Sequence, residues 1–168
     1  MNYNQPSAAT PKNALKATSI IHLALIAGQV LFMIMAFITN KSTIYFDYKN
    51  SRNDVYFYIV PLLAVVGTVV GSFLFNQQMA KFHQALAGSG INKTLSEKLK
   101  VYQSALIVRY ALLEGPSLFG IVCFLLTGNL FYLLISACLI ITMISLRPSV
   151  NATEAYLQLS YDETQQLR

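Results

Sequence analysis

The sequence contains little charge. Only 11% of its residues are Asp, Glu, Lys or Arg, whereas hydrophobic residues make up 55%. In soluble domains about a quarter of the residues are charged. The chain therefore lacks the polar surface that a soluble globular protein needs, and the composition is typical of a membrane protein.

The sequence also lacks the residues of common catalytic and metal sites. It has 2 Cys, 2 His and no Trp. No Ser-His-Asp set, Gly-rich phosphate loop or Cys/His cluster with metal-ligand spacing occurs in it. Cys123 and Cys138 both fall inside apolar runs, where cysteine behaves as a small apolar residue. We therefore expect no enzyme activity, no cofactor and no bound metal.

Four apolar runs take up most of the chain, and each is near the roughly 20 residues that a membrane-spanning helix needs. The runs are Ala17–Thr39, Val55–Phe75, Leu106–Thr127 and Leu130–Leu146. We predict an all-α integral membrane protein with four transmembrane helices in residues 17–148. Residues 1–16 are expected to be a mobile N-terminal tail, and residues 149–168 a cytoplasmic C-terminal tail.

The basic residues are unevenly distributed among the segments between these runs. Of the 12 Lys and Arg, only Lys41, Lys49 and Arg52 fall in the first connection, and the other nine fall in or beside the two tails and the middle loop. Cytoplasmic segments carry the excess of basic residues. We therefore expect both termini on the cytoplasmic side of a bacterial inner membrane. The positive charge reflects this orientation, so the lipid bilayer is the expected partner and nucleic acid is not.

Short signals mark the ends of several predicted helices. The segment Gly88–Gly90 breaks the second helix, and Thr94 with Glu97 forms a capping box that opens the third at the next residue. The turn Thr127–Asn129 is so short that the third and fourth helices form a tight antiparallel hairpin. In the tail, Ala155–Leu167 favours a short cytoplasmic helix that lies against the helix bundle or the lipid headgroups.

An internal repeat relates the first span to the third. When Gly28 is aligned with Gly115, identical residues also coincide at neighbouring positions. The further matches pair Ala24-Leu25 with Ala111-Leu112, Leu31-Phe32 with Leu118-Phe119, Ile34 with Ile121, and Phe37 with Phe124. We infer a duplicated two-helix hairpin whose copies have the same orientation. Ala27 is then the counterpart of Glu114, so only one copy carries an acid.

Glu114 is the one acidic residue inside an apolar run. A charged group at the bilayer centre costs a few kcal/mol, so such groups are buried, neutralised or part of an ion path. Tyr110 and Ser117 share the helix face of Glu114, and both can donate hydrogen bonds to its carboxylate. Gln29 on the first span lies at a similar depth. We take these four residues as a candidate binding site for a proton or Na⁺.

Four glycines are expected to allow close contact between helices, which is the usual role of small residues in membrane bundles. They are Gly67 and Gly71 in the second span, and Gly115 and Gly120 in the third. Pro116 removes one helical hydrogen bond and leaves the carbonyl of Leu112 without its donor. We expect a packed bundle that forms a homo-oligomer or joins a larger membrane complex.

Two functions are compatible with these features. In the first, Glu114 binds or conducts protons or cations. In the second, the protein is a non-catalytic structural or accessory subunit of a membrane complex, and Glu114 stays protonated and clamps neighbouring helices through hydrogen bonds.

Residues Leu113–Gly120, and more loosely residues 55–125, resemble the carboxylate-bearing helix region of the proteolipid subunits of rotary ATPases. That family has an acid, two variable residues, a small residue, an aliphatic residue, an aromatic residue and a glycine. The matching positions here are Glu114, Ser117, Leu118, Phe119 and Gly120. The resemblance implies that Glu114 binds a proton or Na⁺. The chain differs from the family in its longer middle loop and in carrying its acid on the third helix.

Overall fold

The computed structural model describes residues 11–48, 55–89 and 94–167. Within these ranges the chain forms helices and no strand, which confirms the all-α class. The helices are α1 (Pro11–Thr39), α2 (Tyr56–Ser89), α3 (Leu95–Thr127), α4 (Leu130–Ser145), α5 (Val150–Leu157) and α6 (Tyr161–Gln165).

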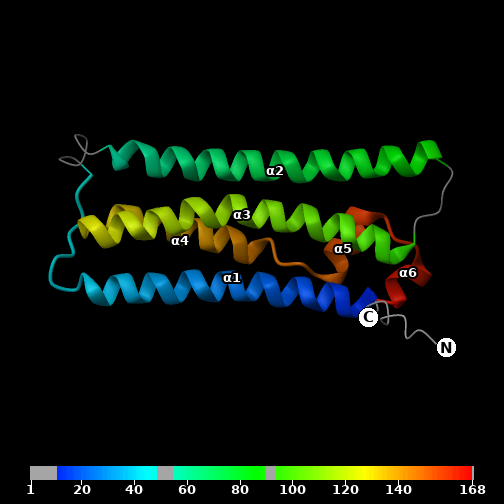
Figure 1. Ribbon diagram of the computed structural model, residues 1–168, viewed down its shortest axis with the longest axis horizontal. Helices are drawn as coiled ribbons and strands as arrows, with labels where there is room; N and C mark the ends of the chain where they lie inside the picture. The colour runs from blue at the N-terminus through cyan, green and yellow to red at the C-terminus, as the bar shows by residue number, and fades with distance from the viewer. Residues whose placement is uncertain (1–10, 49–54, 90–93, 168) are drawn as a thin grey trace, which may run out of the picture.

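Helix α3 is the central element of the bundle. Helices α1 and α2 lie along opposite sides of α3, and α4 runs behind it in the view of Figure 1. Each of these three helices packs against α3, whereas α1 and α2 have almost no contact with each other. A duplicated hairpin would pack α1 on α2 in the way that α3 packs on α4, so the structure does not have the predicted repeat architecture. The connection between α1 and α2 is long and lets the two helices separate.

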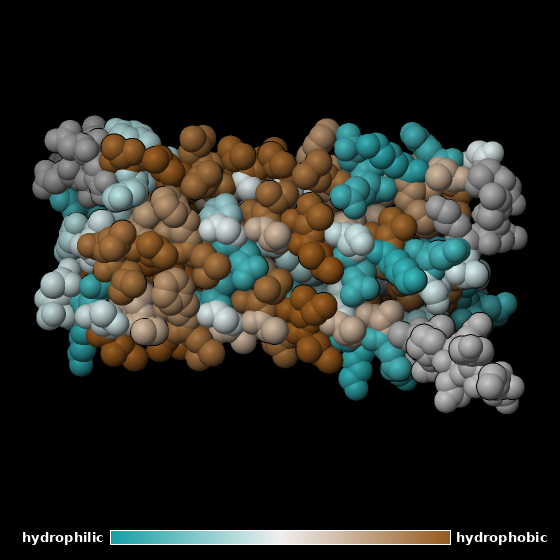
Figure 2. Space-filling model, viewed as in Figure 1, coloured by the Kyte–Doolittle hydropathy of each residue, from teal (hydrophilic) through white to brown (hydrophobic). Residues whose placement is uncertain are grey.

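Three helices, α1, α2 and α3, are long and apolar enough to cross a membrane. Helix α4 has 16 residues, which is short for a span. It counts toward a fourth span only if it is taken together with α5, from which it is bent by 76°. Figure 2 shows hydrophobic residues over much of one face, with hydrophilic residues gathered toward the end where α5 and α6 lie. This pattern is compatible with an integral membrane protein.

Helix α1 begins earlier than the sequence suggested. It starts at Pro11, inside the segment that we expected to be a mobile tail. Proline suits the first turn of a helix because its φ is fixed near the helical value. Leu15 and Thr18 are buried against the rest of the protein, and this packing extends the helix beyond the apolar run. Residues 1–10 lie outside the described part of the chain.

The boundaries of the central helices agree with the predictions. Helix α3 begins at Leu95, where the backbone N–H of Thr94 donates to Oε2 of Glu97 at 3.0 Å. Helix α2 ends at Ser89, within the predicted Gly-rich break. The tight hairpin between α3 and α4 is also confirmed.

The first loop closes that hairpin, an interaction that no sequence pattern indicated. The side-chain Nδ2 of Asn40 donates to the backbone oxygens of Phe124 and Leu125, both at 2.9 Å, and so adds to the capping of the last turn of α3, where the N–H of Gly128 also donates to the oxygen of Phe124 at 2.7 Å. The Nδ2 of Asn129 donates to the backbone oxygen of Asp47 at 2.7 Å. These bonds fasten the end of α1 to the α3–α4 turn and hold α1 away from α2.

The C-terminal tail forms two short helices where one was predicted. Helix α5 ends at Leu157 and is followed by Gln158, which has a left-handed conformation with φ of 49°. Helix α6 is opened by a second capping box, in which Oε2 of Glu163 accepts from the N–H of Ser160 at 3.0 Å. The single-helix prediction overlooked this box. Both helices pack on protein. Leu157 of α5 and Leu167, which follows α6, are buried in one apolar cluster with residues of α2 and α3, and Thr164 of α6 is also buried.

Helices α2 and α3 approach closely at Gly67. A Cβ atom at this position would overlap the carbonyl oxygen of Leu112 and would lie 3.0 Å from Cγ of Pro116. Because Pro116 has no N–H, the Leu112 carbonyl has no donor within α3, and the glycine lets the backbone of α2 cover it. At Gly71 the nearest neighbour of such a Cβ is 3.4 Å away, an ordinary contact.

We therefore predict that Gly67→Ala destabilises the protein and that Gly71→Ala, its matched control, does not. Overpacking at residue 67 should cost about 1–3 kcal/mol. Alanine fits at residue 71, where its better helix propensity contributes up to about 1 kcal/mol. Denaturant titration of the detergent-solubilised variants measures both free energies of unfolding. Equal stability of the two variants would contradict the described contact.

An ion pair holds α6 against α3. The Nζ of Lys98 donates to Oε1 of Glu163 at 2.6 Å, and the two side chains are only 15% and 21% exposed. Partial burial by itself would raise the pKa of the Glu163 carboxyl. The hydrogen bonds from Lys98 and Ser160, together with the charge of Lys98, outweigh burial and lower this pKa below its ordinary value of 4.5.

A carboxyl with a lowered folded-state pKa stabilises the fold at pH values above its unfolded-state pKa, and this contribution is lost as the pH falls through the folded-state pKa. We expect the amide protection factors of α6 in hydrogen exchange to be full at neutral pH and to fall below pH 4.5. Glu163→Gln should lower them already at neutral pH. Asp162→Asn, on the same helix, serves as the control and should behave as the wild type; if it matched Glu163→Gln, the ion pair would not be the cause.

Candidate functional site

Glu114 lies on the part of α3 that no other helix fully covers. We call this part the open face of α3 and define it by Ile107, Ala111, Glu114 and Gly115. Ile107 is 41% exposed, Ala111 and Gly115 are exposed, and Glu114 is partly exposed. A Cβ at Gly115 would meet nothing within 4 Å. Gly115 therefore makes no close helix contact within the described chain, and its predicted role in packing stays a prediction for contacts with another molecule.

The hydroxyl groups expected beside Glu114 are turned toward α4 instead. The Oη of Tyr110 donates to the backbone oxygen of Leu146 at 2.8 Å. The Oγ of Ser136 donates to the backbone oxygen of Ser117 at 2.8 Å, and the Oγ of Ser117 lies 3.4 Å from the backbone oxygen of Ser136. Tyr110 and Ser117 are fully buried. They bind α4 because α4 covers their side of α3, and the structure does not bring them to the carboxyl group.

Gln29 also binds elsewhere. Its side chain is 1% exposed, and its Nε2 lies 3.5 Å from the backbone oxygen of Leu25 and 3.2 Å from Sδ of Met143. Among the described residues, the structure records no hydrogen bond or ion pair for the carboxyl group of Glu114. The four predicted site residues therefore do not converge on one ligand.

Of the predicted packing glycines, Gly120 occupies a place as tight as Gly67. A Cβ at Gly120 would overlap Oγ of Ser136 and lie 3.2 Å from the backbone oxygen of Tyr132. Gly67 thus brings α3 close to α2, and Gly120 brings it close to α4. This double contact explains why α3 is the central helix.

Helix α1 carries a buried polar stripe that joins Gln29 to two residues, Thr18 and His22, that were not among the predicted site residues. Thr18, His22 and Gln29 lie on its inward side and are all buried, at spacings that place them on one helix face. The ring of His22 packs against the ring of Tyr110, and their centroids are 4.6 Å apart. Within the described chain, neither ring nitrogen of His22 nor Oε1 of Gln29 has a hydrogen-bond partner. The heptad-like spacing of these residues was the signal for this stripe.

Arg109 does not neutralise Glu114 either. Its Nη2 donates to Oγ of Ser72 at 3.2 Å, and its guanidinium group lies 5.1 Å from the centre of the Phe75 ring. Both partners belong to α2. The basic and acidic groups of α3 therefore point to different neighbours.

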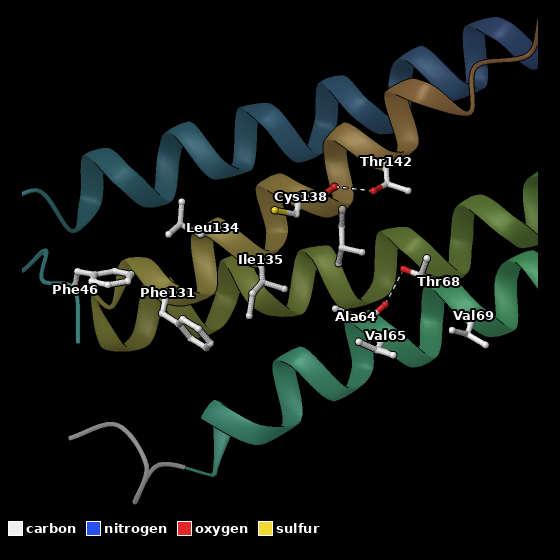
Figure 3. Close-up of a pocket in the computed structure, with 11 residues that line it drawn as sticks. Phe46, Ala64, Val65, Thr68, Val69, Phe131, Leu134, Ile135, Cys138 and Thr142 are labelled. Atoms are coloured by element: carbon white, nitrogen blue, oxygen red, sulfur yellow. Dashed lines mark hydrogen bonds between the residues drawn. The ribbon is translucent and has the colours of Figure 1, made fainter. Parts of the chain in front are cut away.

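A groove of about 590 Å³ lies between α2 and α4, with aliphatic and aromatic walls. Its polar members, Thr68 and Thr142, bond the backbone oxygens of Ala64 and Cys138 in their own helices, at 2.8 and 2.9 Å (Figure 3). No charged side chain lines this groove. Its surface is therefore almost entirely apolar.

The described residues contain no group of three or more His, Cys, Asp or Glu placed to hold a metal ion. No protein family, curated protein or solved structure matches the sequence. The resemblance to rotary ATPase proteolipid subunits therefore stays a prediction.

The separation of Tyr110 from Glu114 is testable by a double-mutant cycle. Tyr110→Phe should lower the free energy of unfolding by about 0.5–1.5 kcal/mol, because the bond to Leu146 is lost. In the double variant with Glu114→Gln, the change in the free energy of unfolding should equal the sum of the two single changes within about 0.5 kcal/mol. A larger coupling energy would mean that the phenol and the carboxyl group bind each other.

Proposed function

We propose that the protein is a non-catalytic structural subunit of a membrane complex, and that its first partner is a second copy of itself bound to the open face of α3. The supporting observation is that the carboxyl group of Glu114 lacks a hydrogen-bond partner within the described part of the chain. This group is partly exposed in the middle of a spanning helix. A polar group in lipid gains from a hydrogen bond to another helix, and the free space beside Gly115 lets such a helix approach.

A second copy fits this face for reasons of symmetry. Copies inserted with the same orientation hold Glu114 at the same depth, and identical residues meet near a two-fold axis. A protonated carboxyl group has one donor and free acceptor capacity, so two of them satisfy each other. Ala111 and Gly115 are small enough to let the two α3 backbones come close.

The same proposal includes a fourth span and an orientation. We propose that α4 crosses the membrane with α5 bent along its surface, and that both termini are cytoplasmic in a bacterial inner membrane. The start of α1 and the short helix α6 lie at the same end of the molecule (Figure 1). The distribution of Lys and Arg favours the cytoplasm for that end.

Cysteine labelling tests this topology. In a Cys138→Ser background, a membrane-impermeant thiol reagent applied to intact cells should label Lys41→Cys and should label Lys81→Cys only after the cells are opened. Labelling of both positions from the same side would contradict the arrangement.

For the association, Glu114→Leu should weaken the dimer and Glu114→Gln should not, because an amide both donates and accepts. A hydrogen bond between spanning helices contributes about 1–2 kcal/mol, so the dimer dissociation constant should rise roughly tenfold in Glu114→Leu. Fluorescence energy transfer between labelled copies in vesicles measures this dissociation constant. Glu154→Leu, the same change outside the spans, is the control. An unchanged constant in Glu114→Leu would contradict the proposed interface.

Proton binding at Glu114 is a second candidate function, and one observation favours it. With no counter-charge among the described residues, the carboxyl group is neutral in lipid only when it holds a proton. A group of this kind carries protons if it alternates between lipid and a polar partner. Proton flux in proteoliposomes that Glu114→Gln abolishes would establish this function, whereas wild-type vesicles without flux would leave the structural one.

A further inference from the structure

A second polar site lies at the opposite end of α1 from the first loop. A pocket of about 310 Å³ opens where α1, the connection between α4 and α5, and the end of the chain meet. Its lining residues are basic, apolar or hydroxyl-bearing, and none is acidic. This pocket shares no residue with the open face of α3.

The positive charge of the pocket comes from Lys12 and Lys16. The two residues are one turn apart on α1 and therefore share a face, and both are exposed. They stand immediately before the apolar run that starts at Ala17. When α1 spans a bilayer, ammonium groups at this level meet the lipid headgroups.

The opposite wall is the first turn of α5. Ser149 caps this helix, since its Oγ accepts from the N–H of Ala152 at 3.2 Å. The backbone N–H groups of Val150 and Asn151 belong to the first turn and have no helical carbonyl to bind. Ser149 and Val150 line the pocket, so the lysines and the positive end of the α5 dipole lie around the same space.

The two walls are tied together. The Oγ of Ser19 lies 3.1 Å from the backbone oxygen of Leu15 and 3.5 Å from that of Pro148. Leu15 and Leu167 are buried at 8% and 3% exposure and also line the pocket. The site is therefore an open hollow with a largely apolar floor, and the two exposed lysines stand at its edge.

We propose that this pocket binds the phosphate group of an anionic phospholipid. The two ammonium groups supply charge, and the first-turn N–H groups supply donors of the kind that bind phosphate at helix N-termini. The acyl chains then run beside Ile20 and Leu23, which are 58% and 66% exposed on the next turns of α1. The proposal is independent of Glu114 and of any dimer.

Titration of the delipidated protein in detergent with phosphatidylglycerol, followed by native mass spectrometry, tests the site. Lys12→Gln with Lys16→Gln should weaken binding of the first lipid roughly thirtyfold. The matched control combines Lys81→Gln with Lys100→Gln, which removes the same charge outside the pocket and should change binding less than threefold. An equal loss in the two double variants would overturn the site in favour of diffuse charge attraction.

Two further measurements test the site independently of the lysine variants. Val150→Pro removes one N–H from the pocket wall and is compatible with the first helical position, so it should weaken phosphatidylglycerol binding several-fold; unchanged binding would overturn the role of α5. Inorganic phosphate at millimolar concentration should leave the bound lipid in place, because it lacks the acyl chains. Displacement of the lipid by inorganic phosphate would assign the pocket to a soluble phosphate instead.

Discussion

Polar groups inside a bilayer have to be satisfied by the protein itself, and the central helix α3 meets this constraint on two of its sides. Toward α2, Arg109 donates to Ser72, and Gly67 leaves room for the α2 backbone to approach the carbonyl of Leu112. Toward α4, Tyr110 donates to Leu146 and Ser136 bonds Ser117. The order of the bundle follows from these contacts, because they require α2 and α4 to lie against α3 at fixed depth.

The same contacts explain why Glu114 stands apart. The hydroxyl groups nearest to it in sequence, on Tyr110 and Ser117, contact backbone oxygens of Leu146 and Ser136 at α4. Arg109 contacts α2 instead. The carboxyl group is thus left on the open face of α3, next to Gly115. A polar group that the fold does not satisfy is best explained by a contact with another molecule. The open position of Glu114 therefore favours assembly as its role.

Local features were predictable from the sequence, and long-range ones were not. The start of α3 after Thr94 and the tight turn before α4 depend on a few adjacent residues. The separation of α1 from α2 depends on Asn40 and Asn129, whose amides bind backbone atoms more than 80 positions away. Periodicity indicated that Tyr110 and Glu114 share a helix face, but it does not say which neighbouring helix covers that face.

Cysteine cross-linking in native membranes is the most direct test of the open face as an interface between copies. In a Cys138→Ser background, Gly115→Cys should form a disulfide-linked dimer upon mild oxidation. Val69→Cys, at a position 61% exposed on α2, should stay monomeric. Failure of Gly115→Cys to cross-link, or equal cross-linking at both positions, would contradict the proposed assembly through α3.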